Sequence, residues 1–169
     1  MSIKKFCFVL KREPCSLIQI TKKAKMDKNN LWRFSASDIV KATKAGEIRC
    51  IDVMTSVIGR MRKVNPKLNA VVIDLSEQAL ETAENLDRDR ANGKACGPLH
   101  GVPITIKINV DQKGYPTSNG VSALKDLLAP DDAPIVKNLK KAGAIIIGLL
   151  VARVRWCVCL FLRLGGVVA

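Results

Sequence analysis

The segment PIVKNLKKAGAIIIG, residues 134–148, predicts a helix, its end and a strand in immediate succession. Pro134 suits the first turn of a helix, where a backbone N–H has no partner, and Gly143 suits the end. The apolar residues 144–147 then predict a buried strand. Because residues 104–108 predict another apolar strand before this helix, the two strands are expected to be parallel and joined by the helix.

Two helices are predicted near the start of the body. Residues 37–46 predict a short helix with Ser35 or Ser37 as its N-cap and Gly46 as its end. The next helix carries apolar residues three and four positions apart and is expected to end near Val64, because the Asn-Pro pair at 65–66 should break it.

A strand and a third helix follow. Residues 70–73 predict a short strand, and Ser76 is expected to cap a helix that ends at residues 92–93. Together with the strand–helix–strand unit, these elements predict an α/β fold with helices around a mixed, partly parallel sheet. The charged residues of the third helix are expected to face water: Glu81, Glu84, Asp87, Arg88, Asp89 and Arg90.

The net charge of +13 on this 169-residue chain lies mostly at its two ends. Residues 1–25 contribute +6 and residues 149–169 contribute +3, which leaves +4 for residues 26–148. We therefore expect a basic, disordered extension over 1–25, a folded body over 26–148 and an apolar, basic tail over 149–169. No nucleic-acid partner is expected, because the body is nearly balanced in charge and aromatic residues make up only 4% of the chain.

No membrane partner is expected either, because Arg153 and Arg155 would lie within the only long apolar stretch, at a cost of about 2.5–3.5 kcal/mol each. The apolar patch at residues 6–10 is too short for a secretory signal, so a cytoplasmic protein is expected. A mitochondrial transit peptide and a translation start at Met26 remain open alternatives.

The cysteines and the histidine limit the possible chemistry. The six cysteines include no Cys-x-x-Cys pair, which favours free thiols in a reducing compartment, although a zinc site remains conceivable. His100 is the only histidine, so mechanisms that need two imidazoles are excluded. The four cysteines that could form such a zinc site are Cys7, Cys15, Cys157 and Cys159.

Lys107 is the candidate for chemistry, because it lies on an otherwise apolar strand. Thr105 and Lys107 share one strand face, and the isoleucines at 104, 106 and 108 share the other. If helices cover both faces, burial should lower the pKa of Lys107 and make it a general base. Alternatively, Lys107 lies at the carboxyl end of the strand and points into water. The pattern leaves both possibilities open.

Residues 97–109, GPLHGVPITIKIN, resemble the segment of amidase-signature enzymes that contains their catalytic lysine. The resemblance implies the N-terminal part of an α/β/α fold and the hydrolysis of a small-molecule amide without a metal or another cofactor. It also implies that Lys107 is the base that relays a proton through a bridging serine to a nucleophilic serine. Further landmarks over residues 31–148 are Gly46-Glu47, Asn65-Pro66, Leu68-Asn69-Ala70, Gly114, Pro116-Thr117, Asn119-Gly120, Ala129-Pro130, Asp132-Ala133-Pro134 and Ala142-Gly143-Ala144.

The chain departs from the family pattern in two places. Asn109 matches, but Ile108 stands where the family often has Asp. In the family, both catalytic serines follow the strand equivalent to residues 144–147, whereas this chain has no serine after Ser122. We therefore expect an inactive, truncated amidase-like protein, and our hypothesis for its tail is translation in a shifted frame. Its strand 144–147 is expected to present an open edge. The alternative is a non-catalytic binding or regulatory module, and the oligomeric state is left open.

Overall fold

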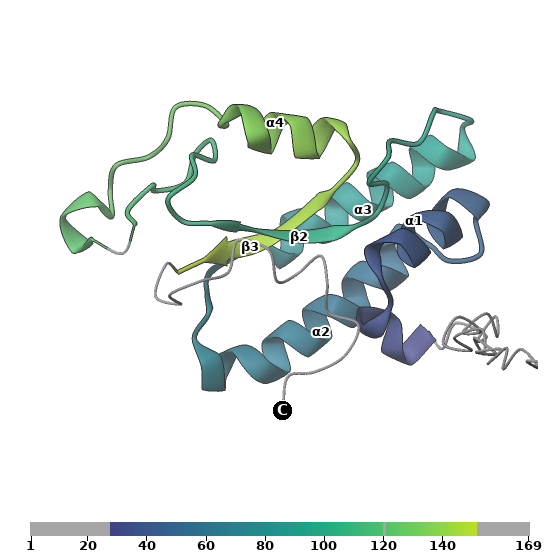
Figure 1. Cartoon of the computed structure of the whole chain (residues 1–169), viewed down its shortest axis with the longest axis horizontal. Coiled ribbons are helices and arrows are strands. Elements are labelled where there is room, and N and C mark those ends of the chain that lie inside the picture. Colours follow the sequence, from purple (N-terminus) through teal and green to yellow (C-terminus); the bar gives the residue numbers. More distant parts are fainter. Residues whose placement is uncertain (1–27, 120, 152–169) are drawn as a thin grey trace, which may run out of the picture.

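The computed structural model describes residues 28–119 and 121–151, so the expectations for residues 1–25, for the tail beyond Val151 and for the four zinc-candidate cysteines lie outside the described residues. Figure 1 shows the arrangement of the elements. In chain order they are η1 (Lys28–Arg33), α1 (Ala36–Ala45), α2 (Cys50–Leu68), β1 (Val71–Asp74), α3 (Ser76–Ala91), β2 (Pro103–Lys107), η2 (Ser122–Leu124), α4 (Pro134–Lys141) and β3 (Ile145–Leu150).

The described strands form a mixed sheet in the order β1-β3-β2. β2 is parallel to β3, with α4 in the connection between them, as the strand–helix–strand pattern predicts. β1 pairs antiparallel with the second half of β3, where Val71 lies opposite Leu150 and Asp74 opposite Gly148. The expectation that strand 144–147 lacks neighbours is wrong on one side, where β2 pairs with β3 from Ile145 to Leu150. On the other side β1 pairs only with Gly148, Leu149 and Leu150, so no described strand lies beside Ile145–Ile147 there.

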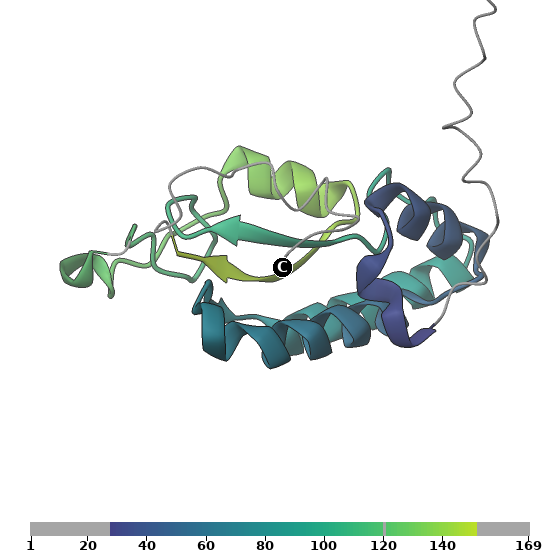
Figure 2. The ribbon, with the colours of Figure 1, turned by 60° about the horizontal axis from the view of Figure 1, so that its bottom comes forward.

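Helices cover both faces of this sheet, as an α/β fold requires. Figure 2 shows α4 on one side of the strands and α2 with α3 on the other. Ile145 and Ile147 pack with the cluster of α1, α2 and α3, while Ile146 packs with Val136 of α4 on the other face. A register shift between Ile146 and Gly148 interrupts the alternation and places Leu149 with Ile146 on the α4 face. β3 is therefore buried on both faces, which explains its unbroken apolar sequence.

The predicted end of α2 is wrong, because the helix continues through Pro66 to Leu68. A proline this close to the end removes only the hydrogen bond to the carbonyl of Arg62. The side chain of Asn65 then joins the helix end to β1: its amide donates to Val71 O at 2.9 Å, and its oxygen accepts from the N–H groups of Ala70 and Val71. These three bonds hold the turn in place of a helix break.

Of the predicted serine N-caps, the one at the start of α1 is confirmed and the one at the start of α3 is wrong. Ser35 is the N-cap of α1, since its hydroxyl accepts from Asp38 N at 3.2 Å. The prediction that Ser76 caps α3 is wrong, because Ser76 is the first residue of that helix. The carboxylate of Asp74 caps α3 instead, accepting from both the backbone N–H of Ser76 at 2.8 Å and its hydroxyl. A carboxylate at this place also faces the positive end of the helix dipole.

Candidate active site: the strand end that carries Lys107

Lys107 is the last residue of β2 and lies opposite Leu150 near the end of β3. The carboxyl ends of two parallel strands therefore meet at this lysine, the position where open α/β sheets bind ligands. Its side chain is half-buried, whereas Ile106 and Ile108 on the other face are only 7% and 6% exposed. The structure thus lies between the two alternatives, because Lys107 is neither sealed in the core nor fully in water.

The backbone on both sides of Lys107 is held by hydrogen bonds. Ile108 N donates to Leu150 O at 2.8 Å, and Val110 N donates back to Lys107 O at 2.9 Å. Among residues 28–119 and 121–151, the Lys107 ammonium forms no ion pair. The fold therefore positions this amine without engaging it in the described part of the chain.

The loop after β2 folds back on itself close to the strand end. The carboxylate of Asp111 accepts from the hydroxyl of Thr117 at 2.6 Å, and the carbonyl of Asp111 accepts from Ala133 N at 2.9 Å. Tyr115 and Ala129 are joined through Ala129 N and Tyr115 O at 3.0 Å. Both ends of this long loop are consequently tied to each other beside β2.

Two aspartates join this loop to α4. Asp132 accepts from Lys113 N at 2.8 Å and from the Lys140 ammonium at 2.6 Å, and Asp131 pairs with Lys137. The hydrogen bond from Lys137 lowers the pKa of Asp131. Burial alone would raise the pKa of Asp132, but the bonds from Lys140 and Lys113 outweigh it and the pKa is lowered. Both carboxylates are therefore structural anions.

The glycines before β2 allow the chain to approach the turn between α4 and β3. A Cβ on Gly97 would lie 2.2 Å from Ala142 O, and Gly101 has a φ of +74°, which favours glycine. Leu99 N donates to Ala142 O at 2.8 Å, and Gly101 N donates to Gly143 O at 3.0 Å. Residues 97–101 thereby deliver the chain into β2 and fix the position of its lysine.

His100, within this segment, is a buried structural residue, only 3% exposed. Its Nε2 lies 3.6 Å from Cys50 Sγ, and its carbonyl accepts from the hydroxyl of Thr43 at 3.0 Å. Burial lowers the pKa of His100 and raises the pKa of Cys50, to which the nearby Asp87 carboxylate adds. A neutral imidazole beside a protonated thiol has no activated nucleophile, so this pair holds the fold together.

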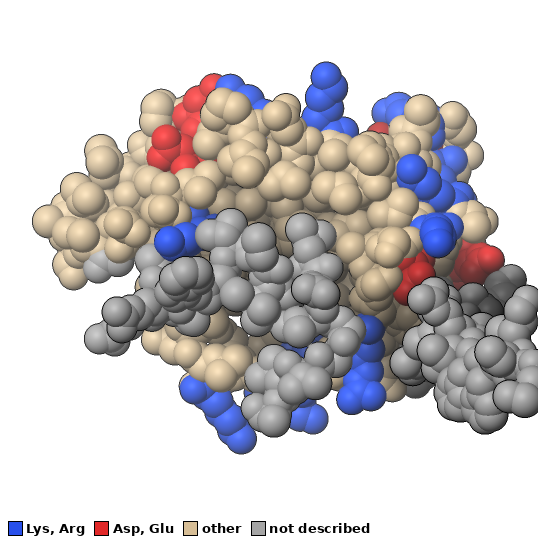
Figure 3. All heavy atoms as spheres, in the orientation of Figure 1, with Lys and Arg blue, Asp and Glu red and all other residues tan. Residues whose placement is uncertain are grey.

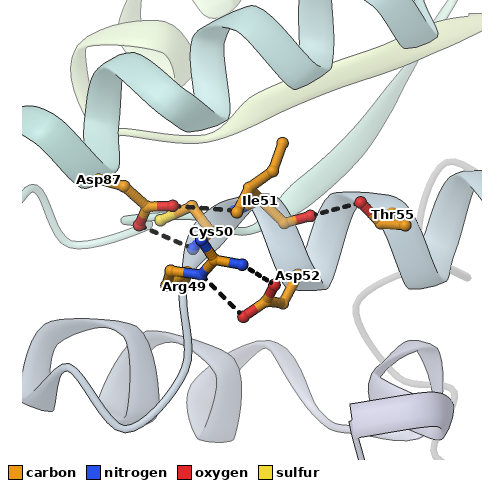
Figure 4. Close-up of polar contacts among 6 residues, drawn as sticks. All are labelled: Arg49, Cys50, Ile51, Asp52, Thr55 and Asp87. Carbon is orange, nitrogen blue, oxygen red and sulfur yellow. Dashed lines mark hydrogen bonds and ion pairs between the residues drawn. The ribbon is translucent and has the colours of Figure 1, made fainter.

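Asp87 does not face water as predicted, and Figure 4 shows why. Its carboxylate lies across the start of α2 and accepts from Cys50 N at 2.8 Å and Ile51 N at 3.1 Å. The N-cap residue Arg49 offers no capping side chain and instead pairs with Asp52 at 2.7 Å. α3 thus supplies the cap of α2, and no local sequence signal marks it.

The described residues contain no group of three or more potential metal ligands, and none of the described helices is long and apolar enough to cross a membrane.

A cavity of about 270 Å³ lies between α3 and the turn from α4 to β3, and Lys107 does not line it. Gln112 lines this cavity, and its Oε1 is buried without a partner in the described structure. On the face seen in Figure 3, Lys and Arg side chains are scattered in several separate groups.

Known proteins are similar to this chain over the same residues. Residues 52–151 match the amidase family. The indoleacetamide hydrolase of Bradyrhizobium diazoefficiens is 55% identical over 72% of this chain and 23% of its own length. The acylamidase of Rhodococcus erythropolis is 33% identical over 73% of this chain and 26% of its own. The chain therefore spans about a quarter of the length of these relatives.

Solved structures agree with the sequence comparisons. A bacterial aryl acylamidase, described as an amidase-signature enzyme, superposes with a TM-score of 0.65 and 30% identity over 69% of this chain and 25% of its own. The peptide amidase of Stenotrophomonas maltophilia superposes with a TM-score of 0.62 and 32% identity over 69% of this chain and 24% of its own. On the sequence match, the shared fold and the motif around Lys107, this chain belongs to the amidase-signature family.

Proposed function

We propose that Lys107 is the lysine of a Ser-Ser-Lys amidase, the base that receives the proton of the serine nucleophile through a bridging serine. The observation that carries this proposal is its place: a half-buried amine at the carboxyl end of β2 with no ion pair among the described residues. Family membership supports an amide as the substrate class.

We further propose that these 169 residues alone do not hydrolyse amides. Residues after Ser122 include no serine, so the nucleophile and the bridging serine have no counterpart where the family resemblance places them. Groups that act as a catalytic unit lose nearly all their rate when one is removed.

A chimera tests the role of Lys107 separately from the activity of the chain. Residues 31–148 would replace the matching segment of the indoleacetamide hydrolase, and ammonia release from indoleacetamide would be measured. We expect hydrolysis by the chimera, its loss with Lys107→Ala, and full activity with Lys141→Ala as the matched surface control. An active Lys107→Ala chimera would refute the role of the lysine.

The same assay on the 169-residue chain tests the second proposal. We expect no ammonia release above the buffer rate, with or without Lys107→Ala. Hydrolysis by the chain that disappears with Lys107→Ala would overturn the proposed inactivity while supporting the role of the lysine. The two proposals can therefore fail independently.

A second candidate is a folded, non-catalytic binding module, which the packing favours. Leu31, Val53 and Val136 are fully buried on the two sides of the sheet, so the described residues form a core of their own. A cooperative denaturant transition would support this candidate, and a non-cooperative one would contradict it. We also propose a cytoplasmic location, which the unpaired thiols of Cys50 and Cys96 support.

A further inference from the structure

β2 is an edge strand of the described sheet, so one side of its backbone has no neighbouring strand. Val102 O accepts from Ile145 N at 2.8 Å, and Ile108 N donates to Leu150 O at 2.8 Å. In a parallel pair, the N–H and C=O of one residue point to the same side, and successive residues alternate. The even-numbered residues of β2 therefore face β3, and the backbone groups of Pro103, Thr105 and Lys107 face outward.

The outward groups form a short, specific pattern. Within residues 28–119 and 121–151, the N–H and C=O of Thr105, the N–H of Lys107 and the C=O of Pro103 have no backbone partner. The C=O of Lys107 is already occupied by Val110 N at 2.9 Å, and Pro103 has no N–H to offer. The edge thus has two open donors and two open acceptors.

This pattern is complementary to itself when a second strand runs antiparallel with Thr105 opposite Thr105. Each Thr105 N–H then donates to the Thr105 C=O of the other copy, and each Lys107 N–H donates to the Pro103 C=O of the other copy. The missing N–H of Pro103 lies opposite the occupied carbonyl of Lys107. Every open group therefore finds a partner, and no donor or acceptor is left over in the pairing.

We propose that this chain forms a twofold symmetric dimer through the outer edge of β2, which joins the two sheets into one continuous sheet. A twofold interface uses the same surface on both copies, as this pairing does. Directly opposite threonines are a favourable cross-strand pair. The two Lys107 residues are four positions apart along the pairing, about 13 Å, so salt screens most of their repulsion. The dimer does not depend on the proposed function.

Sedimentation equilibrium of the full chain tests the dimer directly. We expect the average mass to rise towards that of two chains as the concentration is raised. Thr105→Lys places two ammonium groups opposite each other and should weaken the dimer roughly tenfold or more. Val72→Lys is the matched control: it adds the same charge to a residue that is 41% exposed on β1, at the other edge of the sheet, and should leave the dimer unchanged.

A mixture tests the register. Thr105→Glu mixed with Thr105→Lys should restore association that Thr105→Lys alone has lost, because opposite charges then meet at the twofold axis. A wild-type chain that stays monomeric at every concentration would overturn the proposal. Occupation of the β2 edge by the chain's own residues 152–169 would give this result. Equal dimerisation of Thr105→Lys and Val72→Lys would also overturn it, since the contact would then lie elsewhere.

Amide hydrogen exchange on the wild-type chain keeps the test valid if Thr105→Lys does not fold. The amides of Thr105 and Lys107 should exchange more slowly as protein concentration rises, while the amide of Ile106, bonded to β3 on the other side, should not depend on concentration. Exchange at Thr105 and Lys107 that is independent of concentration would refute pairing through this edge.

Discussion

Replacing Asp87 with alanine should destabilise the fold, although Asp87 lies in the most highly charged stretch of α3, where a solvated side chain is expected. The substitution removes the acceptor of two hydrogen bonds, from Cys50 N at 2.8 Å and Ile51 N at 3.1 Å, at a partly buried helix start. Loss of a helix N-cap costs about 0.5–2 kcal/mol, and loss of the charge at the helix dipole adds about 0.3–1 kcal/mol. Since Arg49 supplies no replacement cap, we expect the free energy of unfolding to fall by the sum of the two, about 1–3 kcal/mol.

Urea unfolding followed by circular dichroism measures the loss in the free energy of unfolding. Two further variants serve as comparisons, one with an intermediate loss and one with almost none. Asp87→Asn keeps one acceptor oxygen and should lose about half as much, because a neutral acceptor makes weaker bonds. Asp89→Ala is the surface control: its ion pair with Lys94 is exposed, so it should cost less than about 0.5 kcal/mol. If Asp87→Ala costs no more than Asp89→Ala, the capping role is refuted.

Two further predictions concern the segment before β2. Burial lowers the pKa of His100, so the folded state favours the neutral imidazole. As the pH drops below about 6.5, the unfolded chain takes up a proton at His100 before the folded protein does. The free energy of unfolding should therefore fall, by at most about 1.4 kcal/mol per pH unit. The charged groups that face His100 are Asp87 and Arg90 of α3 and Lys44 of α1. The measurement is the urea midpoint of wild type and of His100→Asn at several pH values between about 5 and 6.5. If the midpoint of His100→Asn falls with pH as steeply as that of the wild type, His100 is not the group responsible. Gly101→Ala should cost more than about 2 kcal/mol, because φ is +74° and the new Cβ would lie 2.6 Å from Cys50 Sγ. In the double variant, Cys50→Ala should recover part of the stability lost by Gly101→Ala. If the losses of the two single variants simply add up in the double variant, the contact of the new Cβ with Cys50 Sγ does not cause the loss.

Elements with a local signal could be predicted from the sequence. Pro134 and Gly143 mark the ends of α4, and the apolar run after them marks a buried strand, so the parallel pair β2–β3 was predictable. Contacts between distant residues could not be predicted in this way. The partners of Asp87 lie 37 and 36 residues away in the sequence, and the pattern of α3 equally fits a solvated charge.

The position of β3 in the sheet shows the same limit. An apolar run predicts that a strand is buried, but it does not say which strands lie beside it. β1 is short and returns antiparallel along only the second half of β3, an arrangement that depends on the turn held by Asn65. For Lys107, the sequence predicted the strand end, while its half-buried state depends on how helices from elsewhere cover that face.

The motif around Lys107 serves the fold as well as the chemistry. Gly97 and Gly101 are needed for the close approach to the α4–β3 turn, and His100 fills the space beside Cys50, whether or not the chain is an enzyme. Their presence is therefore explained by packing alone. Lys107 differs, because it forms no ion pair in the described part of the chain and its half-exposed strand end would accept many side chains. Lys107→Ala should consequently leave stability nearly unchanged, so that its effect in the chimera reports on chemistry rather than on folding.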